Sequence, residues 1–332
     1  MKIVITGGAG FLGWRLARRL LARGHLTDAR GKEREIRSIV LVDLVPPAQA
    51  LADSRLSLAC GDISDASFLR QTIDAETASI FHLAAVVSGQ AEADFELGMR
   101  INLDASRRLL DHCRTFEQAP KFILTSSVAV YGGQLPERVL DTTALCPQSS
   151  YGVQKAIAEL LVNDYSRRGY VDGRVLRLPT ISVRPGKPNQ AASSFASGII
   201  REPLLGQQAV CPVSPEMRLW LLSPRQAIAS LIVGHELPAA AFAFGRTVNL
   251  PGISVRVAEM VAALGRAAGP ETTQRIRWQI DPLVERIVGS WPQSWDIVRA
   301  NALGFVGDAN FDSIVRAFIE DELPTFSPGV VN

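Results

Sequence analysis

The fold of this chain is decided by the stretch KIVITGGAGFLGWRLARRLL (residues 2–21). The run KIVIT has the β-branched composition of a buried strand, and the leucines after the glycines have the spacing of an amphipathic helix. Between them, Gly7 permits a tight turn, Gly10 lets the backbone approach a phosphate, and Gly13 lets the helix pack closely on the strand. The unpaired N–H groups and the dipole at the start of such a helix favour an anion. The stretch therefore predicts a turn that binds the pyrophosphate of a dinucleotide.

Beyond this turn, short apolar runs alternate with helical patterns as far as Pro179. The strand-like runs lie at 36–43, 56–62, 79–85, 121–127 and 173–179, and the helical patterns lie at 65–73, 95–114 and 151–168. Alternation of this kind predicts right-handed βαβ units and a parallel sheet with helices on both faces. We therefore expect an α/β fold with a Rossmann-type, doubly wound parallel sheet.

After Pro179 the pattern changes. Residues 182–224 are rich in Ser, Pro, Gly and Ala without a clear period, and helical patterns return at 225–237, 255–269 and 310–323. We expect a nucleotide-binding Rossmann domain over residues 1–180, with roughly 225–240 returning to it. Residues 181–224 and 241–332 would form a smaller C-terminal α/β substrate domain. This domain would close a cleft over the carboxyl ends of the strands.

The bulk composition excludes several classes of protein. Of the 332 residues, 47% are hydrophobic and 20% are charged, which is typical of a globule with a sizeable core. The net charge of +2 is too small to argue for a nucleic-acid or membrane partner, and no apolar run reaches the length of a membrane span. The four cysteines are widely spaced, and no His, Asp and Glu spacing suggests a metal. Because no signal-peptide pattern is present either, we expect a cytoplasmic protein without a metal.

Two aspartates follow strands of the expected sheet. Asp43 ends the second strand, where its carboxylate can accept hydrogen bonds from both ribose hydroxyls of a dinucleotide. A 2′-phosphate would be repelled by Asp43, and the next residues, Leu44 and Val45, offer no cation. We therefore expect NAD rather than NADP. Asp62 ends the third strand and could reach the adenine amino group, but a solvent-facing turn explains it equally well.

The motif YGVQK places Tyr151 and Lys155 four residues apart, and therefore on one face of a helix. A free tyrosine is a poor base at neutral pH, since its pKa is about 10. A neighbouring ammonium stabilises the phenolate, so we expect Lys155 to lower the pKa of Tyr151. Ser127 ends a strand and would hydrogen-bond the substrate oxygen, while alternation along the strand turns Ser126 away. These residues predict hydride transfer from a carbinol carbon to NAD, with Tyr151 taking the hydroxyl proton.

The motifs together resemble the extended branch of the short-chain dehydrogenase/reductase superfamily, which is NAD-dependent epimerase/dehydratase-like. The matching pieces are TGGAGFLG (6–13), GD (61–62), HLAA (82–85), Asn102, SSVAVYG (126–132), YGVQK (151–155) and RLP (177–179). In that branch the HLAA stretch lines the cofactor, and the residues after RLP reach the nicotinamide amide. The resemblance thus implies a cofactor-binding set of Gly7, Gly10, Phe11, Leu12, Gly13, Asp43, Asp62, Ile63, Leu83, Ala84, Ala85, Asn102, Tyr151, Lys155, Pro179 and Thr180. It also implies a homodimer built on the helices near 95–114 and 151–168.

Two stretches of the C-terminal third, 178–207 and 249–264, resemble the D-erythronate dehydrogenase group of that superfamily. This group oxidises the C2 hydroxyl of a four-carbon sugar acid to the 2-oxo acid. A sugar acid needs a cation or N–H donors for its carboxylate and polar groups for its hydroxyls. Those groups could come from Arg184, Lys187, Asn189, Ser193, Ser194 and Arg225. We expect the substrate-binding set to be Ser127, Tyr151, Arg184, Asn189 and Ser193.

Two other functions use the same motifs. A nucleotide-sugar 4-epimerase would need the same Ser127, Tyr151 and Lys155 and would keep its NAD tightly bound. A non-catalytic NAD-binding interaction protein would be expected to lose part of this set, which is complete here. A dehydratase is disfavoured, because Val128 follows Ser127 where the acid pair of dehydratases would stand.

Overall fold

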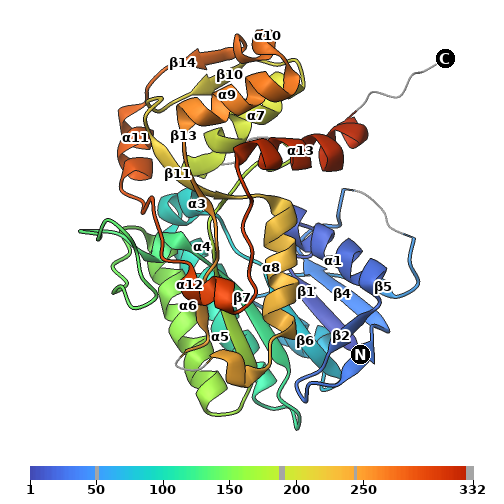
Figure 1. The fold of residues 1–332 in the computed structure, drawn as a ribbon. Helices are drawn as coiled ribbons and strands as arrows, with labels where there is room; N and C mark the ends of the chain where they lie inside the picture. The colour runs from blue at the N-terminus through green and yellow to red at the C-terminus, as the bar shows by residue number, and fades with distance from the viewer. Residues whose placement is uncertain (49–51, 187–190, 243–244, 327–332) are drawn as a thin grey trace, which may run out of the picture.

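The computed structural model describes residues 1–48, 52–186, 191–242 and 245–326. Seven strands form one sheet in the order β12-β8-β7-β6-β1-β4-β5, and all neighbouring pairs in it are parallel (Figure 1). The strands are β1 (Lys2–Thr6), β4 (Ser38–Asp43), β5 (Leu56–Cys60), β6 (Thr77–His82), β7 (Lys121–Ser127), β8 (Asp172–Leu178) and β12 (Thr247–Asn249). The chain order reverses between β1 and β6, and open α/β sheets bind ligands outside the carboxyl ends of their strands at such a point. The expected Rossmann-type sheet is confirmed.

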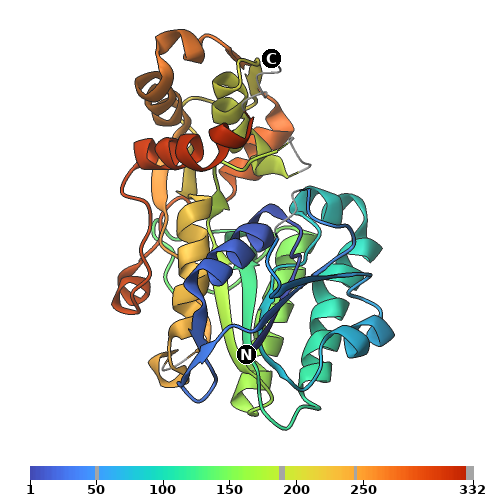
Figure 2. The same ribbon diagram turned by 90° about the vertical axis from the view of Figure 1, so that its right-hand side faces the viewer.

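Helices cover both faces of this sheet, as Figures 1 and 2 show. On one face, α1 (Phe11–Arg23) and α8 (Pro224–Glu236) pack their leucines and isoleucines against Ile3 and Ile5. On the other face, α2 (Ala66–Thr72), α5 (Ala105–Cys113) and α6 (Ser150–Arg167) pack against Val4 and Ile80. Successive side chains of β1 therefore pack against helices on opposite faces of the sheet, as the alternation of side chains along a strand requires.

Two segments are more irregular than their sequence patterns indicate. The helical pattern at 95–114 comprises α4 (Phe95–Gly98), the π-helix η1 (Met99–Asp104) and α5. The polar stretch after α1 contains a small antiparallel hairpin of β2 (His25–Thr27) and β3 (Glu33–Glu35). Two short helices flank the site described below, namely α3 (Ser88–Ala93) and the 3-10 turn η2 (Val128–Val130).

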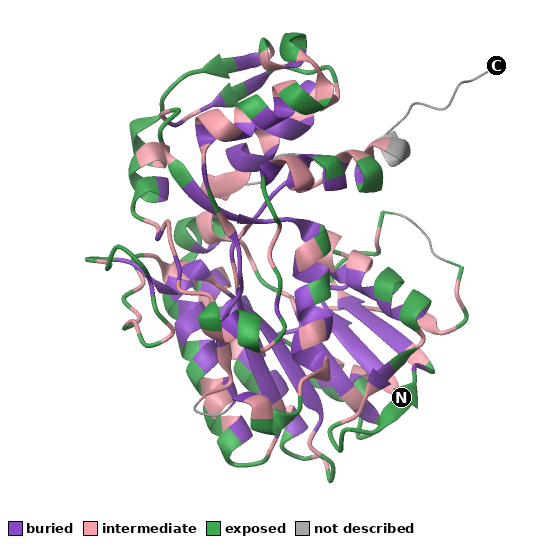
Figure 3. Cartoon of the chain, viewed as in Figure 1, coloured by how far each residue is buried: buried purple, intermediate pink, exposed green. Residues whose placement is uncertain are grey.

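Most of the remaining elements form a smaller layer beyond the carboxyl ends of the large sheet (Figure 1). They are β9 (Thr180–Ile181), η3 (Ala192–Ser194), α7 (Phe195–Leu204), β10 (Ala209–Cys211), β11 (Arg218–Leu222), β13 (Ile253–Arg256), α9 (Val257–Ala268), α10 (Pro270–Thr273), β14 (Ile276–Trp278), α11 (Pro282–Gly289) and α13 (Phe311–Phe326). Two short helices, η4 (Ala239–Phe242) and α12 (Val298–Ala302), instead pack against the large sheet, where Phe242 and Ala300 belong to its core. A hydrophobic cluster of its own joins α7, α9 and α13 to β11 and β13. The large sheet has separate clusters, and Figure 3 shows its strands as mostly buried.

The domain boundaries drawn from the sequence stay a prediction, with one difference in detail. The range 241–332 includes β12, which pairs with β8 and so extends the large sheet. The short run TVN was too brief to stand out as a strand in the sequence. Among the described residues, none of the helices combines the length and apolarity needed to cross a membrane.

Candidate active site

The carboxyl end of β7 and the start of α6 meet at the point where the predicted catalytic residues lie. Ser127 is the last residue of β7, and Tyr151 is in the first turn of α6. Ser149 caps this helix by accepting a hydrogen bond from the Gly152 N–H at 3.2 Å. A Cβ at Gly152 would lie 2.2 Å from the Ala129 carbonyl oxygen, so only glycine lets the helix approach the loop after Ser127 this closely. Gly152 was not among the predicted site residues, although it stands inside the YGVQK motif.

The two serines that end β7 point in different directions. The Ser127 hydroxyl accepts a hydrogen bond from the Ala129 N–H at 3.1 Å and also interacts with Tyr151. The Ser126 hydroxyl donates instead to the carboxylate of Glu159, which is buried behind the strand. The alternation expected along the strand therefore selects Ser127 as the hydroxyl beside Tyr151.

Lys155 lies one helical turn beyond Tyr151 and is buried. Its ammonium donates to the Thr125 carbonyl oxygen at 3.0 Å and lies 5.8 Å from the centre of the Tyr151 ring. Burial lowers the pKa of Lys155 to about 8, against the opposing effect of the Glu159 charge.

The pKa of Tyr151 differs from the sequence expectation. Burial raises the pKa of this phenol to about 12, although the Ser127 side chain and the charge of Arg184 act in the opposite direction. The ammonium of Lys155 is directed at a strand carbonyl, and the groups that lower the pKa of the phenol are Ser127 and Arg184. The expectation neglected the cost of placing a phenolate away from water, which here exceeds the attraction of nearby charges.

The glycine-rich turn has the geometry that a pyrophosphate site requires. Gly7 has a φ of +68° and donates its N–H to the Val42 carbonyl oxygen at 2.8 Å. A Cβ at Gly13 would lie 2.2 Å from the Gly7 carbonyl oxygen, whereas a Cβ at Gly10 would meet only that oxygen, at 3.2 Å. The space beside Gly10 is therefore open at the start of α1, where N–H groups favour an anion. Phe11 and Leu12 follow it in the first turn of this helix.

Asp43 is joined to this turn by direct hydrogen bonds. Its carboxylate accepts from the Ala9 N–H at 2.9 Å and from the Leu44 N–H at 2.8 Å. Asp62 accepts from the Ser64 backbone N–H at 2.8 Å and forms an ion pair with Arg100 at 2.5 Å. Ile63, the neighbour of Asp62, is buried in the core under the sheet end. The Asp43 carboxylate is thus bonded directly to the glycine-rich turn, while Asp62 already has a cationic partner.

The HLAA stretch is held against the glycine turn by a buried chain of hydrogen bonds. The Ala84 N–H donates to the Thr6 hydroxyl at 3.2 Å, and Thr6 contacts His82 Nδ1 at 2.7 Å. On its other side, His82 Nε2 contacts the Ser106 hydroxyl at 2.8 Å, and Ser106 donates to the Asn102 carbonyl oxygen. Because Ser106 uses its only hydrogen on that oxygen, His82 must carry its proton on Nε2. Burial lowers the pKa of His82 to about 3, so this ring stays neutral.

The other residues implied by the resemblance lie around the same sheet end. Leu83 and Ala85 flank Ala84, whose backbone N lies 2.8 Å from the Cβ position of Gly7. The Asn102 amide accepts from the Val86 N–H at 2.9 Å and donates to Gln154 at 2.8 Å, so it holds the loop after HLAA. Pro179 follows β8, and Thr180 in β9 pairs with β11.

The predicted substrate residues are brought together in part. Burial and the charge of Arg201 lower the pKa of Arg184, and nearby Tyr151 opposes this shift. The Arg184 guanidinium has one hydrogen-bond partner among the described residues, the Ser193 hydroxyl at 3.4 Å. Asn189 and Lys187 lie outside the described residues. Arg225 is paired with Asp321 at 2.6 Å, on the surface between α8 and α13.

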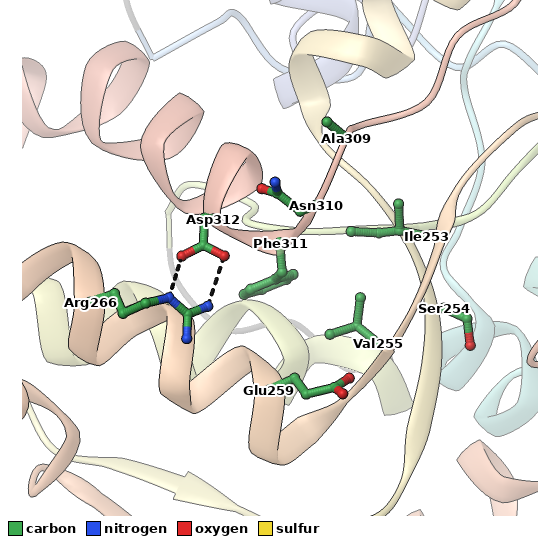
Figure 4. A pocket seen from close by; sticks show the side chains of 9 residues that line it. All are labelled: Ile253, Ser254, Val255, Glu259, Arg266, Ala309, Asn310, Phe311 and Asp312. Carbon is green, nitrogen blue, oxygen red and sulfur yellow. Dashed lines mark hydrogen bonds and ion pairs between the residues drawn. The ribbon is translucent and has the colours of Figure 1, made fainter.

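A separate hollow of about 470 Å³ opens on the smaller layer (Figure 4). It is lined by residues of β13, α9 and the start of α13, and none of the predicted site residues is among them. Its Arg266 and Asp312 are bonded to each other at 2.7 and 2.8 Å. The hollow therefore offers no unpaired charge, and the candidate site remains at the end of the large sheet.

Comparison with known proteins connects this geometry to a family. Residues 3–220 match the model of the NAD dependent epimerase/dehydratase family. A D-erythronate dehydrogenase of Cupriavidus necator is 61% identical over 321 residues, which cover 97% of this chain and 98% of that protein. The D-erythronate dehydrogenase of Haemophilus influenzae is 47% identical, with 97% of this chain and 100% of that protein covered. The nucleoside-diphosphate-sugar epimerase of Agrobacterium tumefaciens superposes with a TM-score of 0.91 at 41% identity, covering 98% of this chain and 95% of that one.

Proposed function

The chain belongs to the NAD-dependent epimerase/dehydratase family, and we propose that it is an NAD-dependent dehydrogenase of D-erythronate. The reaction is oxidation of the C2 hydroxyl of this four-carbon sugar acid to the 2-oxo acid. The similarity extends over nearly the whole chain, including the smaller layer that carries Arg184. The extent of this similarity matters, because in such enzymes the residues that select the substrate lie outside the sheet that binds the cofactor.

One observation carries the assignment of the substrate class, namely the position of Arg184 beside Tyr151. A partly buried guanidinium whose only described partner is a hydroxyl is strongly suited to a carboxylate ligand. A sugar acid has such a carboxylate on the carbon next to the reacting C2 hydroxyl. The charged diphosphate of a nucleotide-sugar is, in contrast, remote from the sugar carbon that an epimerase oxidises. A cation at the reacting centre therefore favours the sugar acid.

The residues present fit NAD as the cofactor. The open space at Gly10 admits a pyrophosphate, and the Asp43 carboxylate beside it can accept both hydroxyls of an unphosphorylated ribose. The neighbours of Asp43, Leu44 and Val45, are exposed and offer no cation to a 2′-phosphate. Bound NAD supplies the acceptor for the hydride that leaves the substrate carbon.

The chain itself supplies orientation and proton transfer. Ser127 would hydrogen-bond the substrate hydroxyl and hold it against the Tyr151 oxygen. Tyr151 takes the hydroxyl proton in its phenolate form and becomes a neutral phenol, and the Lys155 ammonium one turn away would stabilise the phenolate before this transfer. Arg184 would bind the carboxylate of the substrate and so place C2, rather than C3 or C4, at the site of reaction.

The direct test is to mix the purified chain with D-erythronate and NAD⁺ and to record the absorbance at about 340 nm, where NADH absorbs and NAD⁺ does not. We expect NADH release with D-erythronate and none with UDP-sugars, and Tyr151→Phe should abolish it while NADH binding is retained. A nucleotide-sugar epimerase would instead carry bound NAD through purification and convert a UDP-sugar without net NADH. A non-catalytic NAD-binding protein would bind NADH and turn over neither substrate.

Arg184 is tested by comparing Arg184→Met with Arg184→Lys. A charge-assisted hydrogen bond to a carboxylate is worth roughly 1.5–3 kcal/mol, so Arg184→Met should raise the KM for D-erythronate by about tenfold to a hundredfold. Arg184→Lys should recover part of this loss, and NADH binding should be unchanged in both variants. An unchanged KM in Arg184→Met would remove Arg184 from the substrate site.

We further propose that the protein is a cytoplasmic homodimer. The exposed side of α6 carries Val153, Ile157 and Leu160, and exposed Phe95 lies in α4 nearby. Leu160 is 66% exposed, so a second copy that covered this face would remove a large apolar area from water. The four cysteines are free, which suits a reducing compartment.

A further inference from the structure

One face of α6 holds three polar residues against the end of β7. Tyr151, Lys155 and Glu159 are spaced four residues apart, so they lie along the same side of the helix. Tyr151 interacts with the Ser127 side chain, and the Lys155 ammonium donates to the Thr125 carbonyl oxygen. The carboxylate of Glu159 accepts a hydrogen bond from the hydroxyl of Ser126, which lies between Thr125 and Ser127 in β7. Tyr151 and Lys155 already have roles in the proposed reaction. Glu159, the third residue on this face, has none so far.

Glu159 is 2% exposed and is fully engaged by its partners. Arg177 in β8 donates to its two carboxylate oxygens at 2.9 and 2.6 Å in a bidentate pair. Arg177 stands directly opposite Ser126 in the pairing of β7 with β8. A single carboxylate therefore joins α6, which carries Tyr151 and Lys155, to β7, which ends at Ser127, and to β8, which Pro179 follows.

The network extends from Arg177 to the loop that follows Ser127. Arg177 donates to the Tyr131 hydroxyl, and its guanidinium carbon lies 4.9 Å from the centre of the Tyr131 ring. The Tyr131 hydroxyl donates in turn to the Asn249 side-chain oxygen at 3.0 Å. Tyr131 ends the short turn η2 that begins after Ser127. The ion pair thus holds both the strand and the loop around the reacting hydroxyl.

A purely structural role would not require charge at this place. Replacing a buried ion pair by apolar residues of similar volume is often neutral or stabilising, because burial of two charges is costly. Here the negative partner, Glu159, lies one helical turn from Lys155, and its charge raises the pKa of Lys155. The groups that face the Lys155 ammonium are Glu159 and Tyr151 on its own helix and His82 on β6, which is held neutral. Glu159 is thus the only negative charge among these described groups.

We propose that Glu159 is a positioning residue for the oxidation, which keeps Lys155 charged and fixes Ser127 against Tyr151 through Ser126 and Arg177. This inference rests on the proposed function, since Glu159 acts only through the proposed catalytic residues. It predicts a particular pH dependence. Loss of the Glu159 charge removes the one interaction that raises the pKa of Lys155, so the ammonium loses its proton at lower pH. The alkaline limb of the activity profile should therefore move to lower pH.

The experiment compares kcat as a function of pH in the parent chain, Glu159→Gln and Glu159→Asp. Glu159→Gln should shift the alkaline limb downwards by roughly one pH unit and lower kcat, while Glu159→Asp should restore the position of the limb. Because Glu159→Gln leaves Arg177 buried without a counter-charge, it can fail to fold. The double variant Glu159→Gln with Arg177→Met removes both charges and should fold with the same downward shift.

A milder variant tests the positioning of Ser127. Ser126→Ala removes one hydrogen bond to Glu159 and should lower kcat about threefold to tenfold without changing NADH affinity. The matched control is Ser166→Ala, which removes another buried hydroxyl of α6, bonded to the Gly173 N–H at 3.1 Å. This control should lose stability but keep its kcat and its pH profile.

Two results would overturn the inference. One is a folded Glu159→Gln chain, single or double, whose alkaline limb coincides with that of the parent. The other is a Ser126→Ala chain whose kcat equals that of Ser166→Ala. Either result leaves the proposed function intact if Tyr151→Phe is inactive, whereas an active Tyr151→Phe chain would refute the proposed function itself.

Discussion

Alanine substitutions at Gly10 and Gly13 should separate cofactor binding from folding. A Cβ at Gly13 would lie 2.2 Å from the Gly7 carbonyl oxygen and 2.8 Å from the Gly8 Cα, both of which are backbone atoms. The turn or helix α1 must therefore move to admit it. A Cβ at Gly10 meets only the Gly7 oxygen at 3.2 Å, and the φ of −67° at Gly10 suits any residue.

The sizes of the two effects follow from these contacts. Overpacking of the kind expected at Gly13 costs about 1–3 kcal/mol, which corresponds to a fall in Tm of roughly 1–4 °C for a chain of this size. Gly10→Ala should change the Tm of the chain without NADH by about 1 °C or less, since it alters only a helix cap. Its methyl group would occupy the space next to the pyrophosphate, and loss of one charge-assisted hydrogen bond there weakens binding by about tenfold to a hundredfold.

The assay pairs thermal unfolding without ligand with titration of NADH fluorescence. Gly10→Ala should have a near-normal Tm and weak NADH binding, whereas Gly13→Ala should unfold early even without ligand. The reasoning would be refuted by a Gly10→Ala chain that binds NADH normally and loses as much stability as Gly13→Ala. Such a result would mean that Gly10 serves the packing of α1 and does not face the cofactor.

Two further predictions concern pH and assembly. The Lys155 pKa of about 8 lies below the ordinary value of about 10.4, so the burial penalty acts fully below pH 8 and fades between pH 8 and about 10.5. Lys155→Met should therefore be inactive, yet more stable at pH 7 by about 3 kcal/mol in urea titrations. The control is Lys121→Met, which removes another buried lysine with a pKa of about 8. This variant should gain a similar stability and stay active. A Lys155→Met chain that is no more stable than the parent would contradict this account. In sedimentation velocity, Leu160→Glu should yield monomers, whereas Leu283→Glu, at another exposed leucine, should not. An unchanged dimer in Leu160→Glu argues against the α6 interface.

The large sheet could be predicted from the sequence because most of its strands, apart from the edge strand β5, are buried on both faces. The run KFILTSS has the apolar residues Phe122, Ile123 and Leu124 in succession, and the structure places β7 at the same residues, 121–127. The glycine spacing likewise reflects local backbone geometry, which a few neighbouring residues determine. Features that depend on distant parts of the chain were missed. The strand β12 is three residues long, and only its pairing with β8 distinguishes it from a loop.

The electrostatics of the site could be predicted only in part for the same reason. Glu159 and Arg177 look like surface charges in the sequence, because charged residues are rarely buried unless they are paired. Their pairing is a contact between α6 and β8 that no local pattern shows. The pKa of Tyr151 was expected to fall, but it is raised by burial, a quantity that depends on the packing of the whole site.

The spacing of Tyr151 and Lys155 itself follows from how a helix packs on a strand. Four residues of helix advance about 6 Å, and two residues of strand advance about 6.6 Å. Tyr151 contacts Ser127 and Lys155 contacts Thr125, so a step of four on α6 matches a step of two on β7. A spacing of two or five would turn one side chain away from the strand, because only positions three or four apart share a helix face. The YxxxK pattern therefore indicates a catalytic pair only when a strand ends beside the helix. In this chain that strand is β7, which ends in two serines.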